Sequence, residues 1–285
     1  MMKLFFILAT TFIYLSAAIN VTVSILPEKY FVKKIAGNLT NIQVMVKPGN
    51  EPATYEPKPR QLSHLSRSKI YFAIGVPFEK AWLKKFKNIN PHMLIIDITK
   101  NIKKRAMTSY YDIEKNRKYL NSKSSLDPHV WLSPRLVKIM SKNIADTLIK
   151  IDPEHKNTYI ANLHKFNKQI DNLETYAHKK LDNLKHREFI VFHPVWGYFG
   201  DEFALRQIPV QIEGKNPTPK TLVKLIKYAK KRGIKVIFVQ PQFSKKSALT
   251  IAKNLNAKVV SLNPLDENWL KCIKNAIDTF GSILK

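Results

Sequence analysis

The feature that most constrains the fold is one long helical pattern in the middle of the chain. It follows Asp152-Pro153, where an aspartate N-cap and a proline at the first helical position are typical of a helix start. Apolar residues then recur at steps of three and four, with no internal proline or glycine: Tyr159, Ile160, Leu163, Phe166, Ile170, Leu173, Ala177, Leu181 and Leu184. About 30 residues of helix span roughly 45 Å, which predicts a rigid strut between two lobes. A coiled-coil arm is disfavoured because the run holds only about four heptads without alternating flanking charges.

The segments on either side of this helix repeat one scheme, in which strand-like runs alternate with helical runs. In the first half, the pattern predicts strands at 20–26, 43–47, 70–75 and 93–98 and helices at 28–36, 59–67 and 78–86. In the second half, it predicts strands at 189–192, 208–212, 235–239 and 258–262 and helices at 218–232, 244–254 and 267–284. The predicted fold class is therefore α/β, with two lobes of mostly parallel four-stranded sheets with flanking helices, joined by one long rigid backbone helix.

The N-terminus has the pattern of a secretory signal peptide, which we assign to residues 1–18. Lys3 precedes an apolar run from Leu4 to Leu15, and the small residues Ser16-Ala17-Ala18 follow. The run is short for a membrane span, and an uncleaved N-terminal anchor is the alternative. We therefore expect a periplasmic protein. Its expected parts are an N-terminal lobe at 19–150, a linking helix at 151–186 and a C-terminal lobe at 187–285.

Composition narrows the partners and the ligand chemistry. The formal net charge is +27, but the lysines are spread along the chain without a nucleic-acid-binding motif, which favours a solvated basic surface over nucleic-acid binding. Such a surface is also compatible with anionic lipid headgroups or an acidic docking partner. Cys272 is the single cysteine, so a metal site must use histidine, carboxylate or neutral oxygen ligands. The polar, lysine-rich segment 101–126 is predicted to be an exposed loop.

Two histidines stand at the places where a parallel α/β sheet binds ligands, beyond the carboxyl ends of its strands. His129 lies in Asp127-Pro128-His129-Val130-Trp131, and His193 lies in Phe192-His193-Pro194-Val195-Trp196. Neutral imidazole is a common ligand of zinc and other transition metals. A single histidine in such a loop is more often structural, but two in matched positions on opposite lobes indicate a shared metal site. The other six are interpreted as surface residues: His64, His92, His155, His164, His178 and His186.

These motifs, taken together, resemble the periplasmic zinc/manganese-binding receptors of ABC importers, the ZnuA/TroA-like family. The resemblance covers almost the whole mature chain and includes Pro48-Gly49 through Tyr55-Glu56-Pro57, Tyr198-Phe199, Pro241-Gln242-Phe243 and Asn263-Pro264-Leu265. It implies His129 and His193 as ligands. His193 stands at the third ligand position of the family, where a histidine is typical of the zinc-preferring branch. The chain departs from the family at Ala53, at Asn263 and at Gln240, where the family has a histidine, an aspartate and often a glutamate.

Two histidines do not complete a tetrahedral ligand set. The predicted metal residues are His129, His193, Glu51 and Asn263. Glu51 is the preferred carboxylate because it lies in the same loop as Ala53, where the family has a histidine. The alternative interpretation is that Glu51 is a solvated loop residue that binds no metal. Water, Tyr55 and Glu213 are further candidates.

The resemblance implies a non-enzymatic receptor that captures a divalent metal ion, Zn²⁺ first and Mn²⁺ or another transition metal next. Its expected partner is a membrane ABC permease. We expect no nucleic-acid partner, keep an anionic membrane surface as an option, and expect the chain to be a monomer. The incomplete ligand set keeps two alternatives open, a receptor for a metal–chelate complex and an adhesin-like relative with weakened metal binding. A metallo-hydrolase is disfavoured because no motif places a general base beside the histidines.

Overall fold

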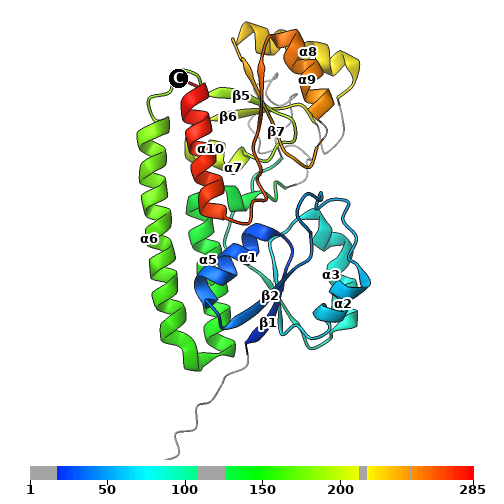
Figure 1. The fold of residues 1–285 in the computed structure, drawn as a ribbon, viewed down its shortest axis with the longest axis vertical. Helices are drawn as coiled ribbons and strands as arrows, with labels where there is room; N and C mark the ends of the chain where they lie inside the picture. Colours follow the sequence, from blue (N-terminus) through cyan, green and yellow to red (C-terminus); the bar gives the residue numbers. More distant parts are fainter. Residues whose placement is uncertain (1–17, 108–125, 212–216, 244) are drawn as a thin grey trace, which may run out of the picture.

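The computed structural model describes residues 18–107, 126–211, 217–243 and 245–285. The signal segment, most of the loop at 101–126, Glu213 and the expected helix start at Ser244 therefore lie outside the described residues. Two α/β lobes lie one above the other beside a long vertical helix, α6 (Figure 1). This arrangement confirms the predicted fold class.

The N-terminal lobe holds a parallel four-stranded sheet in the order β2-β1-β3-β4. Its strands are β1 (Ile19–Val23), β2 (Thr40–Val44), β3 (Ile70–Ala73) and β4 (Leu94–Asp97). Its helices are α1 (Leu26–Ala36), α2 (Pro59–Leu65) and α3 (Pro77–Ile89). Strand β2 begins three residues earlier than the sequence predicts because Thr40 pairs with Ile19 at the start of β1.

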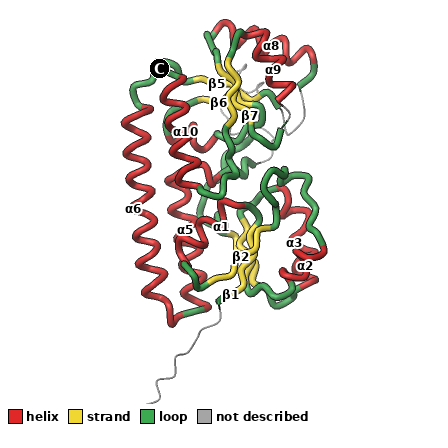
Figure 2. The backbone as a smooth tube through the Cα atoms, in the orientation of Figure 1, coloured by secondary structure: helices red, strands yellow, loops and turns green. Residues whose placement is uncertain are grey.

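The C-terminal lobe repeats this topology, with the parallel order β6-β5-β7-β8. Its strands are β5 (Glu188–Val191), β6 (Arg206–Pro209), β7 (Val236–Val239) and β8 (Lys258–Ser261). Its helices are α7 (Gly197–Glu202), α8 (Pro219–Lys231), α9 (Lys245–Leu255) and α10 (Trp269–Ile283). Every residue of β7 is buried, as expected for a central strand of a parallel sheet covered by helices on both faces (Figure 2).

The predicted strut begins with the short 3-10 turn Pro153–His155 and continues as α6 (Lys156–Leu181). At 26 residues, α6 is about 39 Å long. It packs against a second long helix, α5 (Pro134–Ile151), which the sequence analysis did not anticipate. Among the described residues, no helix combines the length and the apolar character needed to cross a bilayer.

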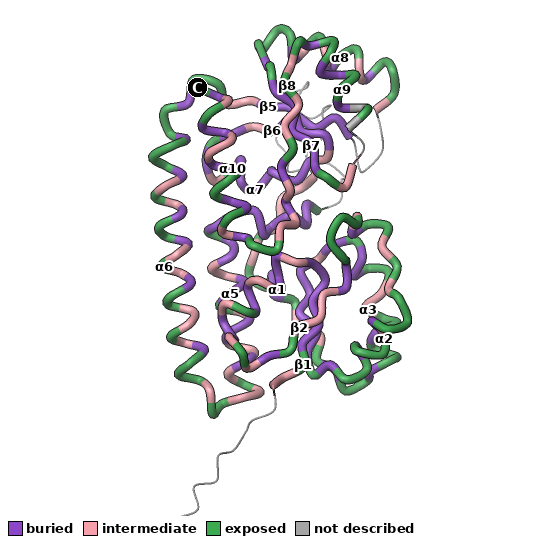
Figure 3. The backbone as a smooth tube through the Cα atoms, viewed as in Figure 1, coloured by how far each residue is buried: buried purple, intermediate pink, exposed green. Residues whose placement is uncertain are grey.

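Both lobes are fixed to α6 by aromatic packing at one level of the helix. The ring of Phe166 lies 6.0 Å from Tyr30 and 6.2 Å from Phe31, both on α1 of the N-terminal lobe. On its other side, it lies 6.1 Å from Trp269 at the start of α10 in the C-terminal lobe. Buried positions recur along the whole length of α6 (Figure 3). One continuous apolar core therefore joins the two lobes.

Direct hydrogen bonds between the lobes reinforce that core. The indole of Trp131, in the 3-10 turn η1 (Val130–Leu132), donates to the Pro264 carbonyl at 2.9 Å. In return, the indole of Trp269 donates to the Trp131 carbonyl at 2.6 Å. Both indoles are buried, so breaking these bonds would leave desolvated polar groups without partners. The interface therefore resists wide opening.

We predict that Phe166→Ala destabilises the whole chain, because it removes the ring that α1 and α10 share. The expected loss is about 3–5 kcal/mol in free energy of unfolding, the usual range for a buried phenylalanine. Chemical denaturation monitored by circular dichroism measures it. His164→Ala, at an exposed position two residues away, is the control and should change stability little. Equal stabilities of the two variants would contradict the shared-core arrangement.

Candidate metal centre

A cavity of about 190 Å³ lies between the carboxyl ends of the two sheets. The N-terminal lobe contributes Glu51, Ala53, Val76 and Lys80, together with His129 from the connection into α5. The C-terminal lobe contributes the facing wall: His193, Val195, Gln240, Gln242, Phe243, Pro264 and Leu265. The two histidines selected from the sequence therefore line one cavity, from opposite lobes.

The ring of His129 is oriented by Asp127, two residues earlier in the chain. Asp127 Oδ1 accepts hydrogen bonds from the His129 backbone N–H at 3.0 Å and from ring Nδ1 at 2.7 Å. The Asp127 side chain is fully buried. A carboxylate only accepts, so Nδ1 carries a proton, and in the neutral form of the ring Nε2 keeps its lone pair. A carboxylate on the second ring nitrogen is the usual support of a metal-binding histidine.

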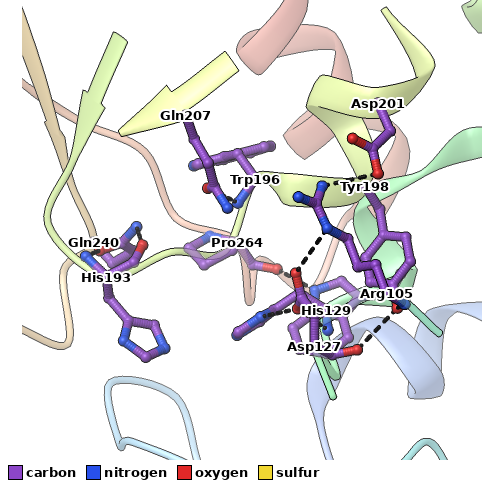
Figure 4. Close-up of polar contacts among 11 residues, drawn as sticks. Arg105, Asp127, His129, His193, Trp196, Tyr198, Asp201, Gln207, Gln240 and Pro264 are labelled. Carbon is purple, nitrogen blue, oxygen red and sulfur yellow. Dashed lines mark hydrogen bonds and ion pairs between the residues drawn. The ribbon is translucent and has the colours of Figure 1, made fainter. Parts of the chain in front are cut away.

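Asp127 is held in turn by residues of both lobes (Figure 4). Arg105 lies 4.0 Å from Asp127 Oδ2 through Nε and 2.8 Å from Asp201 Oδ2 on α7 through Nη1. The Tyr198 hydroxyl donates to the Asp127 carbonyl at 3.0 Å. A Cβ at Gly197 would lie 2.8 Å from both Arg105 Nη1 and Asp127 Oδ2, so this close approach requires glycine.

His193 follows β5 and is oriented by neutral partners. Its ring Nδ1 donates to Gln211 Oε1 at 3.0 Å, which again leaves Nε2 with its lone pair. The side-chain amide of Gln240 fixes the His193 backbone by accepting from its N–H at 3.3 Å and donating to its carbonyl at 3.0 Å. Phe243 stacks on the ring, with centroids 5.0 Å apart. Burial, followed by the proximity of His129, lowers the pKa of His193 to about 4, so this imidazole is neutral at neutral pH.

The two imidazoles have the spacing that one bound ion requires. Their ring centroids are 5.5 Å apart, and the ring planes meet at 77°. Two imidazoles on one tetrahedral zinc, each with Zn–N of about 2.0–2.1 Å, have centroids about 5 Å apart. A single ion can therefore reach both Nε2 atoms with only a small adjustment of the rings.

The N-terminal wall of the cavity is shaped by a buried glutamate at the start of α3. Glu79 accepts hydrogen bonds from the backbone N–H groups of Ile74 at 2.9 Å and Gly75 at 2.7 Å, and from the hydroxyl of Ser24. These bonds fix the turn that carries Val76 to the cavity. Gly75 has φ +91°, a backbone conformation that favours glycine.

The remaining predicted ligands differ in whether they line the cavity that holds the two histidines. Glu51 lines the cavity, and burial raises its pKa while the Ala53 N–H and His129 act in the opposite direction. Asn263 borders a neighbouring hollow instead, and its Oδ1 accepts hydrogen bonds from Gln242 Nε2 and the Leu265 N–H, both at 3.1 Å. The Tyr55 hydroxyl donates to Gln61 within the N-terminal lobe. In the described part of the chain, no three His, Cys, Asp or Glu side chains cluster as a metal site.

Two supporting residues were missed from the sequence. Asp127 stands in the same motif as His129, and its spacing of two residues is a signal that could have identified it as the partner of Nδ1. Gln211 has no such signal, because it meets His193 only through the pairing of β6 with β5.

Two α/β lobes bound to one long helix, with an imidazole from each lobe in the intervening cavity, define the class of two-lobed solute receptors for metal ions. Residues 21–282 match the family model ZnuA, described as "Zinc-uptake complex component A periplasmic". The chain belongs to this family. The family consists of binding receptors for metal transport and not of enzymes.

Known relatives support this assignment over most of the chain. The zinc-binding protein AdcA of Streptococcus pyogenes serotype M3 is 28% identical over 280 residues, which is 94% of this chain and 54% of AdcA. The chain thus spans about half the length of this relative. The high-affinity zinc uptake system protein ZnuA of Bacillus subtilis is 25% identical over 252 residues, covering 87% of this chain and 79% of that protein. A crystal structure of ZnuA superposes with a TM-score of 0.86 at 38% identity, covering 94% of this chain and all of that one.

We predict that Asp127→Asn weakens metal binding by about 10–100-fold, the usual effect of losing a carboxylate behind a ligating histidine. Unlike a carboxylate, which only accepts, an asparagine amide can also turn an N–H towards Nδ1, so it no longer fixes the His129 ring in one tautomer. Competition with a chromophoric zinc chelator measures the affinity, and thermal unfolding checks the fold. Asp182→Asn, at an exposed position just after α6 where the carboxylate pairs with His178, is the matched control. Asp127→Asn protein that binds as tightly as the unmodified chain would show that this contact does not support the site.

Proposed function

We propose that this chain captures a divalent metal ion between its lobes and delivers it to a membrane ABC permease. One observation carries the proposal: an imidazole from each lobe lines the same cavity with its Nδ1 already hydrogen-bonded, and the centroids of the two rings are 5.5 Å apart. The names of the relatives AdcA and ZnuA, which refer to zinc binding and zinc uptake, support zinc as the cargo. One copy of the chain suffices, because both imidazoles belong to the same polypeptide.

For the ligand set, we propose His129 and His193 with Glu51 as the carboxylate. Glu51 lines the same cavity, but it does not cluster with the two rings, so its loop would have to move towards them for the three side chains to share one ion. Nitrogen ligands with one carboxylate suit Zn²⁺, and carboxylate and water suit Mn²⁺. The amide oxygen of Asn263 could join only after releasing its hydrogen bonds to Gln242 and Leu265. Asn263 is therefore the weakest member of the proposed set.

For the delivery step, we propose a small lobe displacement in the periplasm. The shared core around Phe166 and the paired indole bonds of Trp131 and Trp269 oppose a wide hinge motion. The pattern of a signal peptide at residues 1–18 supports export. We propose that metal loading alters the cavity rim and that the permease reads this local change.

An anionic membrane surface is proposed as a further partner, through the outer helical layer of the C-terminal lobe. Every charged residue from Pro217 to Leu265 is a lysine or an arginine. This stretch includes α8 and α9, which lie side by side at the end of the molecule away from the N-terminal lobe (Figure 1). Val223 and Leu249 are 53% and 55% exposed on these helices. Cations with interspersed apolar side chains suit the interface of a bilayer that carries anionic lipids.

The metal-binding proposal predicts that His129→Ala and His193→Ala each abolish tight zinc binding, because either change leaves one imidazole. Isothermal titration of metal-stripped protein with zinc gives the affinity, and we expect a loss of at least about 100-fold. His178→Ala, an exposed histidine on α6, should bind as the unmodified chain does. Unchanged isotherms in both cavity variants would reject the proposal.

The membrane proposal predicts that the triple variant Lys220→Glu, Lys227→Glu and Lys253→Glu loses sedimentation with phosphatidylglycerol vesicles. Each lysine near an anionic surface is worth about 1 kcal/mol, so reversing three charges should weaken binding by at least about 100-fold. Binding of the unmodified chain should also fall with salt.

The matched control carries the same change of net charge on α6, as Lys156→Glu, Lys165→Glu and Lys179→Glu. It should still sediment with the vesicles, because α6 lies on the opposite side of the C-terminal lobe from α8 and α9 (Figure 1). Equal binding of the two triple variants, or binding to neutral vesicles, would contradict a membrane role for the α8–α9 layer.

A further inference from the structure

The cavity wall beyond the imidazoles is apolar, which is unusual for a site that holds only an ion. The residues around this space are Val76, Met107, Leu126, Val195, Phe243, Pro264 and Leu265. A bound ion with two protein nitrogens needs further donors, and water molecules that supply them need polar partners of their own. Most of this wall offers no such partner. This apolar wall favours contact with the carbon atoms of an organic ligand.

The size of the space also exceeds the needs of an ion. A water molecule occupies about 30 Å³ of liquid, so a cavity of about 190 Å³ corresponds to a small organic molecule. Ala53 lines the cavity beside Glu51, and its methyl group leaves this corner open. On the wall of the C-terminal lobe, Phe243 lines the same cavity and stacks on His193.

The charges of the lining match a neutral or anionic ligand better than a bare dication. Among the described residues, and apart from the histidines, the charged groups that line the cavity are one carboxylate, Glu51, and one ammonium, Lys80. The described part of the C-terminal wall adds the neutral amides of Gln240 and Gln242. A dication held by these groups would keep most of its charge in a partly buried site, which is costly. A chelator that carries carboxylates neutralises the ion before it enters.

We propose that the cargo is a metal ion already complexed by a small carboxylate-bearing chelator of the amino-acid or hydroxy-acid class. His129 and His193 complete the coordination of the ion, the carbon skeleton of the chelator contacts the apolar wall, and a free carboxylate faces Lys80. This inference rests on the proposed function, because it requires the ion between the two imidazoles. It adds that the chelator, and not the protein alone, supplies donors at the positions that His129 and His193 leave open.

The test compares zinc alone with zinc plus L-histidine or citrate on metal-stripped protein. After gel filtration, metal analysis and isotopic counting give the zinc and the labelled chelator retained per chain. We expect zinc and one chelator to be retained together, with apparent zinc affinity raised at least tenfold. L-histidine retention indicates an amino-acid chelator, and citrate retention indicates a hydroxy acid. A competing chelator would instead lower zinc affinity without being retained, and that result with both probes overturns the inference.

Substitutions at two positions, Ala53 and Lys80, sharpen this test. Ala53→His adds an imidazole to the open corner of the cavity, so it should bind bare zinc more tightly and retain less chelator. Lys80→Ala should reduce chelator retention several-fold without weakening the binding of zinc alone, and Lys80→Arg should restore retention. If the substitutions at Ala53 and Lys80 leave chelator retention unchanged, the proposed position of the chelator in the cavity is contradicted.

Failure of the proposed metal-capture function can be distinguished from failure of the chelate inference. If metal capture fails, zinc would not be retained under any condition, or His129→Ala and His193→Ala would leave its retention unchanged. Zinc that binds through both imidazoles while the chelator never does would leave the receptor function in place and reject only the chelate.

Discussion

The site depends on one type of interaction, the hydrogen bond at Nδ1 of each imidazole. Asp127 accepts this bond from His129, and Gln211 accepts it from His193. Each bond fixes the ring and places the lone pair on Nε2, which is the atom that faces the cavity. Without these partners the rings could rotate or present a proton, and the centroid spacing of 5.5 Å would not create a binding site.

The two supports differ in charge. The carboxylate of Asp127 accepts the Nδ1 hydrogen bond of His129 and is itself tied to α7 through Arg105 and Asp201. On His193, burial and then the proximity of His129 lower the pKa to about 4, although the hydrogen bond to Gln211 acts in the opposite direction. One imidazole is thus anchored across the lobe interface. The other remains free of a proton well below neutral pH, and so available to a metal.

Much of this arrangement could be predicted from the sequence, because the signals are local. The period of α6, the strand–helix alternation and the motifs around His129 and His193 predicted the strut, both sheets and the choice of these two histidines. Only His193 lies just after a strand, whereas His129 lies in the turn that leads into α5. Helix α5 was missed although Leu136, Met140, Ile144 and Leu148 recur at steps of four. The partner of His193 could not be predicted, because Gln211 reaches it only through the pairing of two strands. Likewise, the hydrogen bonds that turn Asn263 away from the cavity depend on Gln242, a contact between two loops.

The central claim is that one metal ion is held by an imidazole from each lobe. X-ray absorption at the zinc edge tests it most directly on the loaded protein, because multiple scattering from imidazole rings counts the histidine ligands. The account predicts two imidazole nitrogens at about 2.0–2.1 Å, with oxygen atoms completing the coordination. A spectrum with no imidazole contribution, or with a single ring, would contradict it.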